Sequence, residues 1–114
     1  MNANDVIEEF WRIQDDGDYT ALVPLFAEDA LLEDPVYGNF QGRDAIQGFM
    51  EKMNVEMQGR NIDFVANQIA GDGEVALCQW TARTPDGDIE GCGLYRTRDG
   101  KLVYYKDYME RPAP

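Results

Sequence analysis

Asp34 is the residue whose type and position most suggest chemistry, because it is a carboxylate directly before Pro35. Proline keeps the residue before it in extended conformation, so Asp34 is expected to end a short strand anchored by Leu31, Leu32 and Val36. A carboxyl group held in a cavity of low dielectric has a raised pKa and can act as a base. The competing interpretation is an exposed, turn-forming acid before a proline.

A second carboxylate, Asp107, lies near the end of the chain. Strand alternation in this stretch puts it on one face with Tyr105 and Met109. A surface ion pair with Lys106 or Arg96 is the alternative role. Two acids on one cavity would repel each other, and this would raise the pKa of one of them.

The sequence contains no histidine, which excludes Ser-His-Asp and Cys-His catalysis and the common zinc sites. A general base must then be Asp, Glu, Lys, Tyr or a thiolate. The two cysteines, Cys78 and Cys92, are expected to be free thiols. We therefore expect no metal and no cofactor.

With 114 residues, 44% of them hydrophobic, the chain is expected to form one domain, residues 1–114. A formal charge of −12 argues against nucleic acid or an anionic membrane as a partner. The acidic start MNANDVIEEF lacks the pattern of a signal peptide, and no apolar run is long enough for a membrane span. These features predict a cytoplasmic location.

Hydrophobic periodicity predicts three helices followed by four strands. The first helix is expected from a cap at Asn2 or Asn4 to about Gln14, and the third from Arg43 or Asp44 to before Gly59. Between them, a second helix is expected through Leu22, Leu25 and Phe26. It should be short, kinked or partly 3₁₀, because Pro24 lies inside it. Residues 37–42 should form a short extended arm. The strands are expected at Ile62–Ile69, Glu74–Thr84, Asp88–Arg96 and Lys101–Met109. Short Asp-Gly turns between them predict an antiparallel meander, and hence an α+β domain with helices on one face of a curved sheet.

Three stretches in this order, DDGDYTALVPLFAEDALLEDPVYG, FQGRDAIQGFMEKM and GCGLYRTRDGKLVYYKDYMER, resemble the nuclear transport factor 2-like superfamily, and most closely its SnoaL-like and ketosteroid-isomerase-like branch. The resemblance implies a cone-shaped, cystatin-like α+β fold in which helices and a curved, mainly antiparallel sheet enclose a deep apolar pocket. It also implies a homodimer formed through the outer face of the sheet.

The resemblance assigns catalytic roles to two residues. The proton-shuttling acid of the isomerases falls on Asp34, and an acid of the late strands serves as the base in SnoaL-type cyclases, which points to Asp107. The tyrosine and aspartate that hold the oxyanion in the isomerases fall on Phe10 and on or beside Cys92, which predicts against steroid isomerisation. The residues expected to bind substrate are Phe10, Trp11, Tyr37, Met50, Met53, Trp80, Cys92, Tyr105 and Met109.

The sequence therefore predicts a cofactor-independent isomerase, cyclase or lyase for a small apolar molecule that carries a carbonyl group. Asp34 would be its general base, with Asp107 and Tyr105 orienting the polar end of the substrate. The alternative is a non-catalytic ligand-binding or dimerisation module on the same fold.

Overall fold

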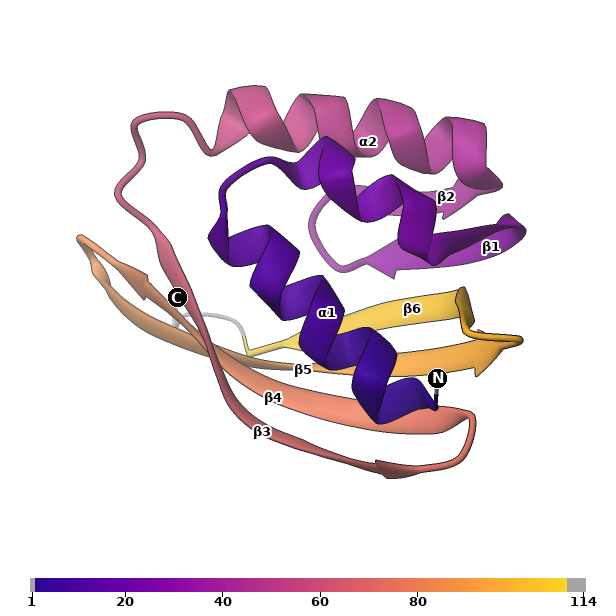
Figure 1. Cartoon of the computed structure of the whole chain (residues 1–114). Helices are drawn as coiled ribbons and strands as arrows, with labels where there is room; N and C mark the ends of the chain where they lie inside the picture. The colour runs from indigo at the N-terminus through magenta and orange to yellow at the C-terminus, as the bar shows by residue number, and fades with distance from the viewer. Residues whose placement is uncertain (1, 111–114) are drawn as a thin grey trace.

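A computed structural model describes residues 2–110 of the chain, so Arg111, the last residue of the third matching stretch, lies outside the described part. The described residues form two α-helices, one 3₁₀-helix and six strands, whose arrangement is shown in Figure 1. In chain order these are α1 (Ala3–Asp15), η1 (Tyr19–Leu25), β1 (Phe26–Asp34), β2 (Gly38–Gln41), α2 (Arg43–Glu56), β3 (Asp63–Asp72), β4 (Val75–Thr84), β5 (Gly87–Arg98) and β6 (Lys101–Met109).

All six strands form one sheet with the order β2-β1-β6-β5-β4-β3. The predicted antiparallel meander of β3 to β6 is confirmed, and β1 and β2 form a further antiparallel pair. The single parallel contact joins β1 to β6, with Leu32 opposite Tyr105. This contact brings the strand that ends in Asp34 beside the strand that carries Asp107, although the two residues are far apart in sequence.

The helices cover one face of the sheet, as predicted, with α1 lying across the inner face of the meander (Figure 1). The helix α1 begins with a capping box, because the Asn2 side chain accepts from the Asp5 amide at 3.0 Å and the Asp5 carboxylate accepts from the Asn2 amide at 3.2 Å. Its buried face presents Phe10 edge-on to the rings of Phe26, Tyr95 and Tyr105. Such pairs add about 0.5–1.5 kcal/mol each beyond the area that they bury.

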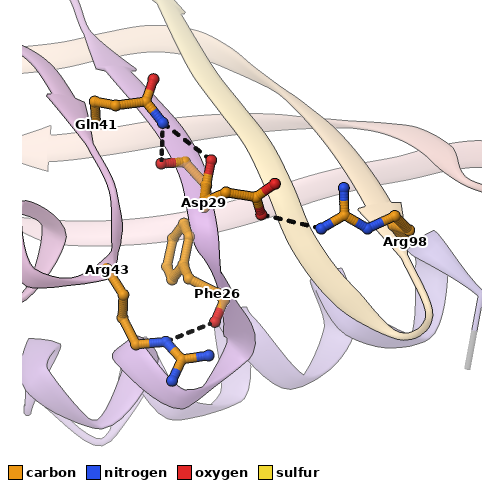
Figure 2. A network of polar contacts seen from close by, with 6 residues as sticks. Phe26, Asp29, Gln41, Arg43 and Arg98 are labelled. Atoms are coloured by element: carbon orange, nitrogen blue, oxygen red, sulfur yellow. Dashed lines mark hydrogen bonds and ion pairs between the residues drawn. The ribbon is translucent and has the colours of Figure 1, made fainter.

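The strand β1 is irregular between Phe26 and Leu31, where its pairing with β6 shifts register. Side chains bind two backbone carbonyl groups of this stretch. Gln41 Nε2 donates to Asp29 O at 3.0 Å, and Arg43 Nε donates to Phe26 O at 3.1 Å (Figure 2). These hydrogen bonds support the irregular part of β1 from the neighbouring β2 and α2.

Two expectations need correction. The second helix is a 3₁₀-helix, in line with Pro24, but it ends at Leu25, and Phe26 already belongs to β1. The three helices also do not all precede the sheet, since β1 and β2 come before α2. The expected arm at residues 37–42 is extended because it pairs with β1 as β2.

Candidate active site

A cavity of about 300 Å³ lies between the inner face of the sheet and the helices. Its wall combines residues of α1, η1, α2 and five of the six strands and is mostly apolar. The volume corresponds to about ten water molecules and lies at the small end of the range for ligand cavities. Asp34 and Asp107 both border this cavity.

Most of the residues predicted to bind substrate also border the cavity. Two come from each long helix, one from the turn after β1, and the others from β4 and β6. These residues are Phe10, Trp11, Tyr37, Met50, Met53, Trp80, Tyr105 and Met109. Aromatic and methionine side chains form an apolar, adaptable wall.

Asp107 is held by two hydrogen-bond donors of the wall. The Tyr105 hydroxyl donates to Oδ2 at 2.6 Å, and Trp80 Nε1 donates to Oδ1 at 3.2 Å. Tyr105 lies two residues earlier on β6 and so shares the inward face of the strand, as alternation predicts. Trp80 comes from β4, whose inward residues face the same cavity.

The environment of Asp107 disfavours its charge. Burial among protein atoms raises the pKa of Asp107 from 3.8 to about 7. The hydrogen bonds from Tyr105 and Trp80 act in the opposite direction, and the negative charge of Asp34 raises the pKa further. The carboxyl group therefore changes its protonation state near neutral pH, at the wall of the cavity.

Two glycines of β5 make room for this arrangement. Gly91 is paired with Trp80, and a Cβ atom at Gly91 would lie 2.6 Å from Cε2 of that indole. Gly93 is paired with Asp107, and a Cβ atom there would lie 3.1 Å from its Oδ1 and 2.8 Å from Cε1 of Tyr95. We did not predict this role from the sequence, although two glycines at alternate positions inside a strand indicate a close approach of side chains to the backbone.

Asp34 shows features of both arrangements that the sequence left open, a turn-forming aspartate and a carboxylate at a cavity. Its Oδ1 accepts from the amides of Val36 and Tyr37 at 2.8 and 2.9 Å, the pattern of a turn-forming aspartate. The side chain also borders the cavity, and within residues 2–110 no protein donor binds Oδ2. This oxygen is the part of Asp34 that remains available to a ligand or a water molecule.

The prediction that Cys92 belongs to the binding site is wrong. Cys92 is paired with Gln79 and with the exposed Tyr108, so it lies on the outer face of the sheet and does not border the cavity. The inward positions beside it are Gly91 and Gly93. The error is one residue of register, which moves a side chain to the opposite face of a strand.

The cavity wall also contains residues that the sequence analysis did not single out. Phe64 of β3 and Ile89 of β5 are both paired with Ala82, which is inward-facing like Trp80, so strand parity could have identified them. The indole N–H of Trp11 and the hydroxyl of Tyr95 are buried and make no hydrogen bond of normal geometry within the described part of the chain, although Trp11 and Tyr105 both lie close enough to Tyr95 to affect its pKa. The Tyr95 ring packs 4.6 Å from that of Tyr105.

The thiols are poor candidates for chemistry. Burial raises the pKa of Cys78 to about 12 and also raises that of Cys92, so both are protonated at neutral pH. Residues 2–110 contain no cluster of three or more His, Cys, Asp or Glu side chains that could hold a metal ion. No helix in the same range is long and apolar enough to cross a membrane.

Solved structures with the same fold place this architecture in a known class. A nuclear transport factor 2-like protein of unknown function from Cytophaga hutchinsonii is 18% identical, with a TM-score of 0.75 over 96% of this chain and 92% of that one. A proposed ketosteroid isomerase from Kribbella flavida is 15% identical, with a TM-score of 0.79 over 97% and 79% of the two chains. A proposed polyketide cyclase from Sinorhizobium meliloti is 22% identical, with a TM-score of 0.73 over 91% and 94%. These matches establish the fold as nuclear transport factor 2-like.

The sequence itself matches the SnoaL-like domain family over residues 7–105. The protein belongs to this family, which confirms the resemblance inferred from the three sequence stretches. No curated protein matches the sequence.

Proposed function

We propose that this single-domain protein is a cofactor-independent enzyme that transfers a proton on a small, largely apolar molecule carrying a carbonyl group. The observation that carries the proposal is Asp107, a carboxyl group with a pKa of about 7 at the wall of an apolar cavity. A general base is most effective when its pKa lies close to the working pH.

In the proposed reaction Asp107 removes a proton from the carbon next to the carbonyl group. The carboxyl group becomes neutral, the form that its buried position favours. The Tyr105 hydroxyl then loses its charged acceptor and can donate to the enolate oxygen of the substrate. Return of the proton to the same carbon gives exchange, and return to another carbon gives isomerisation.

Asp34 takes the second role in this proposal. Its Oδ1 is engaged by two backbone amides, whereas Oδ2 faces no protein donor in the described residues. Because the charge of Asp34 raises the pKa of Asp107, Asp34 helps to keep the pKa of the base close to neutral pH. It also provides a carboxylate that can relay the proton.

The experiment is proton exchange in D₂O. The α-protons of a panel of small cyclic and aromatic ketones are followed by NMR with the wild-type protein, Asp107→Asn and Asp34→Asn. We expect the wild-type rate to rise with pH up to about 7, because only ionised Asp107 accepts a proton, and Asp107→Asn to reduce it by about 10²–10⁴-fold. An Asp107→Asn variant that keeps the wild-type rate would contradict the proposal, and a larger loss in Asp34→Asn would make Asp34 the base.

A non-catalytic binding module is the second candidate. It is favoured by the hydrogen bonds of Asp107, since both carboxylate oxygens already accept from protein donors, Tyr105 and Trp80. Phe10, at the position of the isomerase tyrosine, also has no group that can donate to an oxyanion. Ketones that bind in the cavity without exchange would support this function.

We also propose a homodimer formed through the outer face of the sheet. Val75, Leu77 and Tyr108 are exposed on this face, with Tyr108 51% exposed. The cations Arg96 and Lys106 lie over the rings of Tyr104 and Tyr108 on the same face. Light scattering tests the dimer: Leu77→Lys should give monomers, and unchanged mass would contradict this interface.

A further inference from the structure

Within the part of the chain that the structure describes, the carboxylates of the cavity have no positive partner. Among the described residues that border it, the one cation is Arg60, which is bound to Glu56 at 3.0 Å and has a side chain that is 51% exposed. The groups in contact with Asp107 are neutral donors, Tyr105 and Trp80. A buried carboxylate without a countercharge is unfavourable, and it becomes neutral or recruits a cation.

The remaining wall is suited to an organic cation. Aromatic side chains from α1, from the turn after β1 and from three strands border the same cavity as Asp107. They are Phe10, Trp11, Tyr37, Phe64, Trp80 and Tyr105. Aromatic faces attract ammonium groups, most strongly where water is excluded. Within this chain, Lys52 already lies 5.3 Å from the centroid of the Tyr37 ring.

We propose that the ligand of this cavity is a lipophilic organic cation, an amine or a quaternary ammonium, whose positive charge lies beside Asp107 among the aromatic rings. The proposal concerns the same cavity as the proposed function and adds the charge of its substrate. A bound cation keeps Asp107 ionised, which is the form that accepts a proton in the proposed reaction. A ligand with an anionic group is disfavoured, because it would approach Asp34 and Asp107 together.

Binding of a cation must then depend on pH through Asp107. The other titratable groups that interact with the charge of Asp107 are Asp34 on β1, Cys78 on β4, Cys92 and Tyr95 on β5, and Tyr105 on β6. Burial raises the pKa of both cysteines and both tyrosines, so these four are neutral between pH 6 and 8. Asp107 is therefore the group that changes its charge in this interval.

The experiment compares two molecules of the same shape, phenyltrimethylammonium and tert-butylbenzene, by calorimetry and NMR titration at pH 6, 7 and 8. The quaternary ammonium has no acidic proton, so any proton released comes from the protein. With a pKa of about 7, Asp107 is mostly ionised at pH 8 and mostly neutral at pH 6. We expect the affinity for the cation to fall about tenfold from pH 8 to pH 6, with release of about half a proton per cation at pH 7.

The neutral molecule should bind about tenfold more weakly than the cation at pH 8, and its affinity should not fall toward pH 6. The Asp107→Asn variant should lose the pH dependence of cation binding, while Asp34→Asn should keep it with a lower midpoint. A cation that does not bind, or that binds equally at the three pH values, would overturn the proposal, as would persistent pH dependence in Asp107→Asn. Because these titrations involve no turnover, they separate this proposal from the proposed function, which would survive if neutral ketones exchanged their protons and the cation did not bind.

Discussion

The partly buried carboxyl group of Asp107 makes the stability of the fold depend on pH in an unusual direction. Its pKa is about 7 in the folded protein and ordinarily 3.8, so between these values the folded state holds a proton that the unfolded state has released. Stability must therefore fall as pH rises through this interval. At 1.36 kcal/mol for each pH unit, the difference between the two pKa values corresponds to about 4 kcal/mol.

Urea unfolding at pH 5, 6, 7 and 8 measures this contribution when the wild-type protein is compared with Asp107→Asn. Between pH 5 and pH 8 the wild type should lose about 2.5 kcal/mol of unfolding free energy, because its carboxyl group must ionise in the fold and about two pH units of the interval between its two pKa values lie in this range. The neutral amide does not ionise, so the variant should lack this loss. Its free energy of unfolding should therefore increase relative to that of the wild type as pH rises. Parallel curves for the two proteins would refute the reasoning, since they would mean that Asp107 ionises equally in both states.

Three further substitutions test the surroundings of Asp107. Tyr105→Phe removes a donor to the carboxylate and should raise the pKa of Asp107, as measured by carboxyl NMR; a lower value would contradict the hydrogen bond. Asp34→Asn removes a negative charge and should lower the pKa of Asp107, whereas an unchanged pKa would mean that the two carboxylates do not interact. Gly93→Ala places a methyl group against Tyr95 and Asp107 and should cost about 1–3 kcal/mol in urea unfolding. The control Gly48→Ala lies on an exposed helix position with no atom near its Cβ and should stabilise the protein by about 0.5–1 kcal/mol; an equal effect of both changes would contradict the role of Gly93.

Local sequence signals predicted the elements that depend on local physics. Strand alternation and Asp-Gly turns indicated the meander of β3 to β6, and hydrophobic periodicity indicated the helices α1 and α2. The parallel pairing of β1 with β6 was not predicted, because it joins segments separated by most of the chain. This pairing brings the strands of Asp34 and Asp107 together, so the closeness of the two acids depends on tertiary structure and not on local sequence.

In the candidate site, too, features set by local sequence were predicted and features set by the alignment of distant strands were not. Alternation on β6 correctly grouped Tyr105, Asp107 and Met109, and the cavity borders all three. Cys92 was placed wrongly because its position came from counting along a motif, where an error of one residue exchanges the two faces of a strand. The hydrogen bonds from Tyr105 and Trp80 to Asp107 depend on the space above Gly91 and Gly93, which becomes visible only when β4, β5 and β6 are aligned.

The most direct test of the account is the titration of the Asp107 carboxyl carbon by NMR in the folded protein, with Asp107→Asn used to assign its signal. The account predicts a midpoint at about pH 7. A midpoint close to 4, the range of an ordinary aspartate, would contradict it, because Asp107 would then be a solvated surface acid and neither the proposed base nor the proposed partner of a cation.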